Sequence, residues 1–345
     1  MYVVIFVHNR GFNKLNYFVK GLTDLGYRVS IITDFVYESQ VNRFQLNDAE
    51  IIVDESFSKF EIGKPDWIFC LNENLLPVQA SIDEDLSLTA SNVLVHKNLF
   101  NDYCRKNGLG EYIPKSVVPY QPSDLDLFSG PFYIKPTVGT GTKREGKYEK
   151  LMYYGFECKS DFLLFLRQNG LDDFFRDNYQ SMTRPNFNNV PFRFMAEEYL
   201  EGEDTISPYV YIDNESKPNL LWWSKNEIKR FSERGLRFED QIWKISSQEV
   251  VDERGEMIMD FHTRFAKELG IKNMIFSGPD MYENGKIIDI NPRPGNGMAI
   301  ASSFNKDLWR MIIEEKRCEL KNHYLWTAES YVTDPAVRPI YRLNS

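Results

Sequence analysis

The sequence predicts an α/β protein of two or three compact units, and three observations support this. The chain has 345 residues, whereas a typical domain has about 100–200. Its first ninety or so residues alternate between short apolar runs and amphipathic segments, as in a sheet connected through helices. Hydrophobic residues make up 42% of the chain and aromatic residues 14%, which is enough to build real cores.

The N-terminal part has the βαβ order of a small doubly wound unit. Tyr2–Val7 predicts a buried strand, and Asn13–Leu25 predicts a helix that ends at Gly26. Arg28–Thr33 and Asp66–Leu71 predict two further strands. In such units ligands bind beyond the carboxyl ends of the strands.

Two polar turns follow strands of this unit. The turn at residues 8–11 (His-Asn-Arg-Gly) lacks the spaced glycines of a dinucleotide fingerprint, so we expect no Rossmann cofactor there. Residues 72–74 (Asn-Glu-Asn) stand where a substrate group could bind. A plain polar loop is the alternative, and the sequence alone favours it.

The middle of the chain contains the next predicted elements. They are a helix at Lys97–Lys106, a strand at Phe132–Pro136, a glycine-threonine loop at 137–143, a helix at Ser160–Asn169 and a strand at Phe194–Leu200. The two glycines of the loop would let backbone N–H groups approach phosphate oxygens closely, although a flexible hairpin tip has the same spacing. The loop is not a Walker loop, because its lysine does not directly follow a glycine.

The last third combines strands, helices and a charged stretch. The predicted elements are strands at Tyr209–Ile212 and Leu220–Trp223, a charged stretch from Lys225 to Lys244, helices at Asp252–Leu269 and Leu308–Cys318, and an extended tail.

A hairpin in this region carries the strongest functional signal. Asn284-Gly285 between short apolar runs predicts a tight turn that sets Asp280 beside Asp289. Asp289 and Asn291 are two residues apart on a strand, so they point to the same face. Two carboxylates and an amide oxygen suit Mg²⁺ carrying nucleotide phosphates, and Arg293 could meet the remaining anionic charge. An ordinary hairpin with solvated acids is the alternative.

Charge and cysteine content exclude several other classes of protein. The net charge of −9 and the isoelectric point near 5.2 argue against a protein that coats nucleic acid. The four scattered cysteines lack the spacing of a zinc or redox motif and indicate a reducing compartment. The N-terminal apolar run is too short for a signal peptide, and no apolar run approaches the ~20 residues of a membrane helix. We therefore expect a soluble, cytoplasmic protein.

Several of these motifs occur together, in a characteristic order. Lys97 is followed by Lys135 with its glycine loop, by the stretch 197–204 (Glu-Glu-Tyr-Leu-x-Gly-x-Asp) and by the 280–293 hairpin. In this arrangement the chain resembles the ATP-grasp superfamily of carboxylate–amine ligases, such as biotin carboxylase, D-alanine–D-alanine ligase and L-amino-acid ligase. The resemblance implies a Rossmann-like N-terminal domain at 1–92, a central lid-bearing domain at 93–198, a C-terminal catalytic domain at 199–320 and a tail at 321–345.

The resemblance also implies a nucleotide site. Lys97 and Lys135 would contact ATP phosphates, the glycine loop would close as a lid, the strand end at 197–200 would read the adenine edge, and Asp204 would bind the ribose. The implied residues are Lys97, Lys135, Gly139, Thr140, Gly141, Glu197, Glu198, Tyr199, Leu200 and Asp204. Family members usually carry Glu at the ribose position, and Glu203 is a second candidate for that contact.

For the metal and the chemistry, the resemblance points to the hairpin. Asp280, Asp289 and Asn291 would hold one or two Mg²⁺ ions, with Mn²⁺ as an alternative, and Arg293, Asn291 and Asp289 would be catalytic. The chain departs from the family pattern in two places. Gly278 stands where many relatives have an arginine, and Asp289 stands where the bridging acid is usually glutamate, so bridging two metals is less secure.

The implied activity is ATP-dependent amide formation through an acyl phosphate, with a small-molecule carboxylate and an amine as substrates and neither nucleic acid nor membrane as a partner. A small-molecule kinase and a nucleotide-binding protein without turnover are the alternatives. Family members are often homodimers. Six basic residues lie where the family supplies substrate or phosphate contacts, and the sequence does not choose among Lys225, Lys229, Arg230, Arg234, Arg237 and Lys244.

Overall fold

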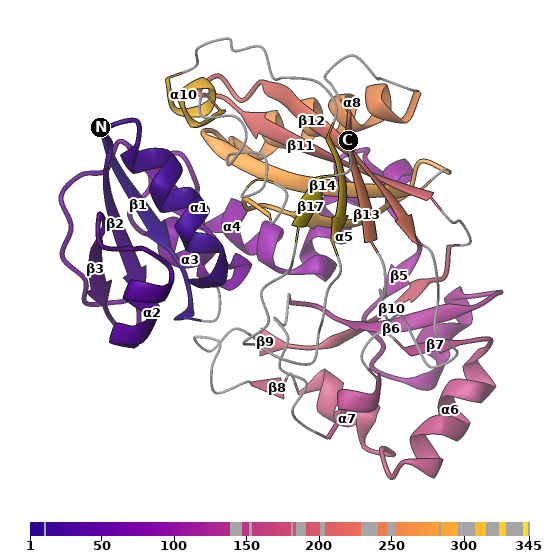
Figure 1. The fold of residues 1–345 in the computed structure, drawn as a ribbon. Coiled ribbons are helices and arrows are strands. Elements are labelled where there is room, and N and C mark those ends of the chain that lie inside the picture. The colour runs from indigo at the N-terminus through magenta and orange to yellow at the C-terminus, as the bar shows by residue number, and fades with distance from the viewer. Residues whose placement is uncertain are drawn as a thin grey trace.

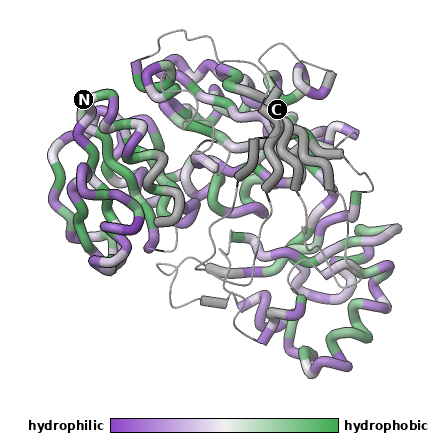
Figure 2. Tube along the Cα trace, in the orientation of Figure 1, coloured by the Kyte–Doolittle hydropathy of each residue, from purple (hydrophilic) through white to green (hydrophobic). Residues whose placement is uncertain are grey.

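The computed structural model shows three lobes, an N-terminal, a central and a C-terminal one (Figure 1). It describes residues 1–9, 12–138, 147–151, 154–180, 182–183, 191–200, 204–228, 241–246, 253–282, 284–295, 298, 308–314, 324–328 and 341–343. Hydrophobic stretches run through each lobe (Figure 2). The boundaries predicted after residues 92, 198 and 320 stay predictions.

The N-terminal lobe is built on a four-stranded parallel sheet in the order β3-β2-β1-β4. Its strands are β1 (Tyr2–Phe6), β2 (Arg28–Thr33), β3 (Glu50–Val53) and β4 (Trp67–Cys70). Its helices are α1 (Phe12–Thr23), α2 (Glu38–Arg43), α3 (Leu76–Gln79) and α4 (Leu88–Val95). The three predicted strands and the helix are confirmed, whereas β3 was not predicted, because its apolar run, Ile51–Val53, is only three residues long.

The two faces of this sheet are buried in two different cores. Val3 and Ile5 face a core that also contains Trp309 of α10 (Leu308–Ile313). Val4 and Phe6 face a core that also contains residues of α5 (Lys97–Lys106) and α8 (Glu253–Leu269). Because side chains alternate across a strand, a continuous apolar run is required where both faces are covered. Both cores join the N-terminal sheet to the C-terminal lobe.

The central lobe has a four-stranded antiparallel sheet in the order β5-β10-β6-β7. Its elements are β5 (Ser116–Val117), β6 (Phe132–Pro136), β7 (Tyr154–Phe156), α6 (Lys159–Gln168), α7 (Phe174–Tyr179), β8 (Met182–Thr183), β9 (Pro191–Phe192) and β10 (Phe194–Glu198). An aromatic core including Phe132, Phe162, Phe174 and Phe194 packs its helices on the sheet. The predicted helix and strands are confirmed to within two residues.

The C-terminal lobe is built on a seven-stranded sheet in the order β15-β14-β11-β12-β13-β16-β17. Its strands are β11 (Asp204–Ile212), β12 (Pro218–Ile228), β13 (Gln241–Ser246), β14 (Met274–Tyr282), β15 (Ile287–Asn291), β16 (Tyr324–Ala328) and β17 (Tyr341–Leu343). Short 3₁₀ turns elsewhere in the chain are η2 (Glu73–Leu75), η3 (Gly110–Tyr112), η4 (Pro122–Leu127) and η5 (Glu149–Leu151).

Three predictions for this lobe need correction or qualification. The tail is not merely extended, because β16 pairs with β13 and β17 pairs with β16. Part of the charged stretch forms the end of β12 and most of β13, where residues 225–228 pair in antiparallel register with residues 241–244. Helix α10 ends at Ile313, and residues 315–318 of the predicted helix lie outside the described residues.

The helix that begins at Lys97, α5, packs against the C-terminal lobe. Phe100 of α5 packs against Phe261 and Phe265 of α8, with ring centroids 6.1 Å and 5.3 Å apart. The long helix α8 lies against β11, β12 and β14. The N-terminal end of α5 is thereby fixed near the strands that carry the candidate site. Among the helices described, none is long and apolar enough to cross a membrane.

We expect the buried His262 of α8 to make stability sensitive to acid. Burial lowers the pKa of His262 from 6.5 to about 4, so below pH 6.5 the unfolded chain binds a proton that the folded chain does not. Stability should be complete above pH 6.5 and fall towards pH 4, by roughly 3 kcal/mol at most. Urea unfolding of wild type and His262→Phe across this range tests it: the variant should show a smaller loss, and equal pH slopes would contradict the prediction.

Candidate functional site

The predicted hairpin is present and brings two acidic positions together. Strands β14 and β15 are antiparallel, and Asp280 pairs directly with Asp289. Gly285 in the connecting turn has φ +74°, which favours glycine, and a Cβ there would lie 2.5 Å from the end of Met257. The register shifts on both sides of Asp280, and its side chain lies outside the described residues. The hairpin prediction is confirmed, whereas the metal assignment stays a prediction.

Asp289 of the C-terminal lobe forms an ion pair with Lys97, the first residue of α5. The Lys97 ammonium donates a hydrogen bond to Asp289 Oδ1. Burial disfavours the charged carboxyl, but the positive charges of Lys97 and Lys135 outweigh it and hold the pKa of Asp289 below its ordinary value. The carboxylate is therefore ionised near neutral pH and available as a ligand for a cation.

Lys97 is held in place by its backbone. As the first residue of α5, its N–H donates to the Thr137 carbonyl at the end of β6, 2.7 Å away, and His96 bridges to Val138. The glycine loop predicted as a lid starts directly after this anchor, and Gly139, Thr140 and Gly141 lie outside the described residues. The start of α5, the end of β6 and the β14–β15 hairpin are thus joined through Lys97.

Lys135 is buried and forms an ion pair that the sequence did not reveal. Its ammonium lies 2.6 Å from Glu197 Oε1, and the Tyr133 hydroxyl donates to the same oxygen. Lys135 is 4% exposed and Glu197 1% exposed. Burial lowers the pKa of Lys135 and nearby Lys97 adds to this, while Glu197 opposes it. Antiparallel pairing of β6 with β10 puts these residues together, a signal readable only once the two strands are known to be partners.

The strand end predicted to read adenine is tied into the central sheet. The N–H of Glu198 donates to the Lys115 carbonyl and that of Tyr199 to the Pro131 carbonyl, both at 2.9 Å. The Glu198 carboxylate accepts a further bond from the Lys115 N–H at 2.8 Å. The backbone N–H groups of Glu198 and Tyr199 therefore already donate hydrogen bonds to other backbone carbonyls of the protein. Leu200 follows directly, and its contact with the adenine edge stays a prediction.

The remaining predicted contacts are placed only in part. Asp204 begins β11 opposite Glu227, and Lys225 pairs in register with Lys244 between β12 and β13. The side chains of Asp204, Lys225 and Lys244 lie outside the described residues, as do Glu203, Lys229, Arg230, Arg234 and Arg237 entirely. Their roles stay predictions.

Arg293 joins the metal hairpin to the N-terminal lobe. Its Nε lies 3.0 Å from Glu73 Oε1, and its Nη2 lies 3.3 Å from Asn291 Oδ1. The Glu73 side chain is 13% exposed and that of Arg293 is 22% exposed. This ion pair places Glu73 beside the β14–β15 hairpin, and a substrate-binding role for residues 72–74 stays a prediction. A strand edge brings Glu73 to an arginine 220 residues away, a distance that local sequence patterns do not span.

The donor set suits a hard divalent cation and an anionic ligand. Asp289 and Asn291 offer carboxylate and amide oxygens, the ligand type that Mg²⁺ prefers. Among the described residues no three His, Cys, Asp or Glu side chains form a metal cluster, since Asn291 supplies an amide and the side chain of Asp280 is outside the described set. Lys97, Lys135 and Arg293 place three cations around Asp289, as a polyphosphate requires.

Comparison with known proteins gives similarity at the level of structure. No protein-family model matches this sequence, and no curated protein matches it. Among solved structures, L-amino acid ligase from Bacillus licheniformis is 14% identical with a TM-score of 0.62, covering 95% of this chain and 79% of that one. The ADP complex of N5-carboxyaminoimidazole synthetase from Staphylococcus aureus is 14% identical with a TM-score of 0.60, covering 95% and 81%.

A biotin carboxylase is also similar to this chain in structure. The enzyme from Campylobacter jejuni is 14% identical with a TM-score of 0.58, covering 94% of this chain and 75% of that one. At such low identity the similarity establishes architecture alone. This chain therefore shares its fold with these solved structures over 94–95% of its length.

Proposed function

We propose that this protein is an ATP-dependent carboxylate–amine ligase that forms an amide through an acyl phosphate. The observation that carries the proposal is the contact of Lys97 with Asp289, surrounded by Lys135 and Arg293, in the described part of the fold. Solved structures of similar fold include ligases, one of them in complex with ADP. Phosphoryl transfer depends mainly on positioning and charge neutralisation, and this arrangement supplies both.

In this proposal the two lysines hold the nucleotide. Lys135 would be a fixed, buried cation for the inner phosphates, and Lys97 would contact a phosphate oxygen. Asp280, Asp289 and Asn291 would hold Mg²⁺. The bound Mg²⁺ neutralises charge on the phosphates and orients them. Glu197 keeps Lys135 in place, and the strand end at 198–200 lies beside the base.

Arg293 is the proposed receptor for the acid substrate. It already binds a carboxylate, that of Glu73, at 3.0 Å. A substrate carboxylate that replaces Glu73 would be held next to the metal hairpin, within reach of the γ-phosphorus. This observation favours a ligase over a small-molecule kinase, because a hydroxyl acceptor has no need of a guanidinium partner.

The reaction then proceeds in two steps. A carboxylate oxygen attacks the γ-phosphorus, and ADP leaves. The amine nitrogen attacks the acyl carbon, the C–N bond forms, and the C–O bond to phosphate breaks. Because the acyl phosphate reacts with water, the loop containing Gly139, Thr140 and Gly141 would have to close over it.

A substrate screen tests the reaction directly. Pairs of L-amino acids and metabolite carboxylates, incubated with ATP and Mg²⁺, should release ADP above background for at least one pair. Mass analysis should show an amide of the two substrates. A phosphorylated compound without the amine would identify a kinase instead, and no stimulated ADP release by any pair would contradict the proposal.

Lys135→Met should impair both stability and nucleotide binding, and a second substitution separates the two effects. Removing the lysine leaves Glu197 as an unpaired buried charge, which costs about 3–5 kcal/mol of unfolding free energy. The double variant Lys135→Met/Glu197→Gln should recover most of that stability in urea unfolding while its ATP affinity in calorimetry stays low. Recovery of ATP affinity in the double variant would show that Lys135 does not bind the nucleotide.

Glu73→Gln should strengthen binding of the acid substrate. The variant no longer competes as an anion for Arg293, so the KM of the carboxylate should fall about 3–10-fold, corresponding to roughly 0.7–1.4 kcal/mol, with the KM of ATP unchanged. Glu50→Gln is the matched control, because Glu50 pairs with Arg28 on the exposed edge of the same lobe. A higher KM together with a lower kcat would show instead that Glu73 orients Arg293.

A further inference from the structure

A histidine-centred cluster lies at the carboxyl ends of the N-terminal strands. His8 follows β1, Asp34 follows β2, and Asn74 lies in η2 directly after β4. All four strands are parallel, but β2 and β3 are added on one side of β1 and β4 on the other, so the strand order reverses between β1 and β4. His8 follows the carboxyl end of β1, and Asn74 follows that of β4. In open parallel sheets a ligand binds in the crevice at such a reversal. The topology therefore places His8 where a small molecule is expected.

The His8 ring is fixed on all sides. Its Nδ1 lies 3.0 Å from Asp34 Oδ2, and its Nε2 lies 2.9 Å from Asn74 Nδ2. Its backbone N–H donates to Asn72 Oδ1 at 2.8 Å. Phe57 packs edge-to-face against the ring at 5.1 Å. The side chain is nevertheless 21% exposed, so a ligand can reach it.

These contacts define which nitrogen can accept a proton. Asp34 also accepts bonds from the N–H groups of Asn9 at 2.7 Å and Phe35 at 3.0 Å. Burial works against its charge, but these bonds and the one from His8 outweigh it, so the pKa of Asp34 lies below its ordinary value. An ionised Asp34 accepts Nδ1–H, and Asn74, assigned with its amide nitrogen towards the ring, donates to Nε2. The Nε2 lone pair is the basic site.

The basic nitrogen is connected to the proposed reaction centre through Asn74. Asn74, its donor, is the neighbour in sequence of Glu73, which is bonded to Arg293 beside the metal hairpin. An N–H of a substrate ammonium group could take the place of the Asn74 amide at Nε2. We propose that His8 is the base that takes the proton from the amine substrate, with Asp34 as its positioning partner, an assignment that rests on the ligase function proposed above.

The proton balance of this step is complete. The ammonium substrate transfers one proton to His8 Nε2, giving a neutral amine and an imidazolium paired with Asp34. The amine nitrogen then forms the C–N bond, the C–O bond to phosphate breaks, and the second N–H proton leaves with the phosphate. Imidazolium returns its proton to solvent before the next cycle.

The charged surroundings of His8 are few among the described residues. Asp34 bonds to the ring, and Glu73, the residue before Asn74, forms an ion pair with Arg293. Phe57 contributes an uncharged face from the loop after β3. The side chain of Arg10, two residues from His8, lies outside the described residues. Among the described residues, Asp34 is thus the anion in direct contact with the ring.

The test compares two nucleophiles on the same acyl phosphate, using full-length His8→Gln. Hydroxylamine is uncharged at neutral pH and traps acyl phosphates without a base, whereas L-amino acids enter as ammonium ions. With an acid and an amine found active in the screen, hydroxamate formation should stay within about two-fold of wild type. Amide formation should fall about 100-fold or more at neutral pH, a typical loss for a removed general base.

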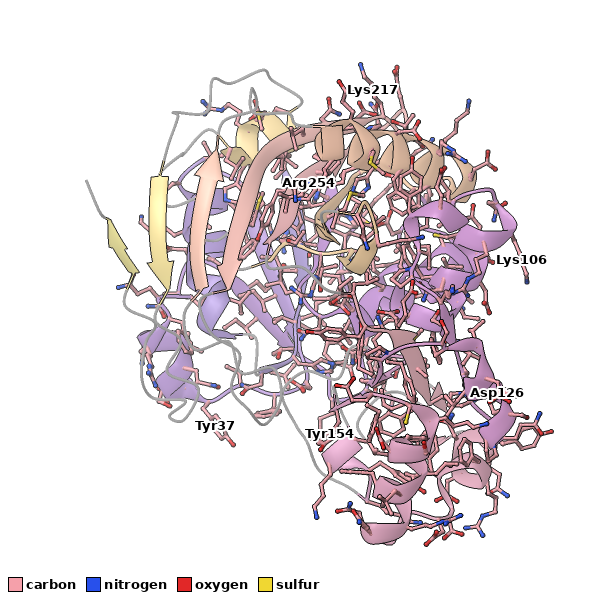
Figure 3. The ribbon with its side chains drawn as sticks, turned by 90° about the vertical axis from the view of Figure 1, so that its right-hand side faces the viewer. Tyr37, Lys106, Asp126, Tyr154, Lys217 and Arg254 are labelled. Atoms are coloured by element: carbon pink, nitrogen blue, oxygen red, sulfur yellow. The ribbon has the colours of Figure 1, made fainter. Side chains whose placement is uncertain are left out.

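The pH profile distinguishes a base from a structural histidine. The amide deficit of His8→Gln should shrink as pH rises, because the amine then loses its proton to water. Asp34→Asn should show the same pattern with a smaller loss. Asp213→Asn is the control: this carboxylate holds the β11–β12 turn through the N–H groups of Glu215 and Lys217. Figure 3 shows Lys217 at the top of the view and Tyr37, three residues after Asp34, at the lower left.

Each outcome is decisive. Selective loss of amide with preserved hydroxamate supports the assignment. Equal losses of both products, or no loss, overturn it and leave the ligase function standing. Wild type that forms no hydroxamate in the presence of acid, ATP and Mg²⁺ overturns the ligase function itself.

Discussion

The contact between Lys97 and Asp289 is the constraint around which the rest of the site is arranged. It joins the first residue of a helix between the lobes to the strand that carries the candidate metal ligands. The carboxylate, whose side chain is 37% exposed, stays charged because Lys97 and Lys135 compensate for its partial desolvation. A ligand that brings both a divalent cation and a polyphosphate can replace this contact with two better ones, one for each partner. The charges around Asp289 are thus balanced within the protein and suit such a ligand.

Burial makes the neighbouring charges dependent on one another. Lys135 and Glu197 are almost inaccessible to solvent, so each requires the other, and Tyr133 completes the hydrogen bonding. The two strands that carry them also anchor Lys97 through Thr137. Positioning of the cations therefore follows from sheet pairing, and a preorganised site of this kind needs little rearrangement when a nucleotide binds.

The N-terminal lobe contributes more than a support for the site. Its sheet shares both of its cores with the C-terminal lobe, through α8 on one face and Trp309 on the other. This packing presents the carboxyl ends of β1 and β4 to the metal hairpin, where Glu73 meets Arg293. In the proposed reaction, the acid substrate would take the place of Glu73 at Arg293, and the amine substrate would take the place of Asn74 at His8. Glu73 and Asn74 are adjacent, so the two substrates would bind next to each other.

The sequence by itself determined the elements whose signals are local. The Asn284-Gly285 turn, the helix at Lys97 and the apolar strand at Tyr2 follow from periodicity and turn chemistry over a few residues, and the order of motifs indicated the fold. Tertiary structure alone decided the pairs Lys97–Asp289, Lys135–Glu197 and Arg293–Glu73, and the strands β16 and β17 of the tail. These contacts join segments far apart in the chain, and their partners are chosen by sheet register and by burial, which no local pattern encodes.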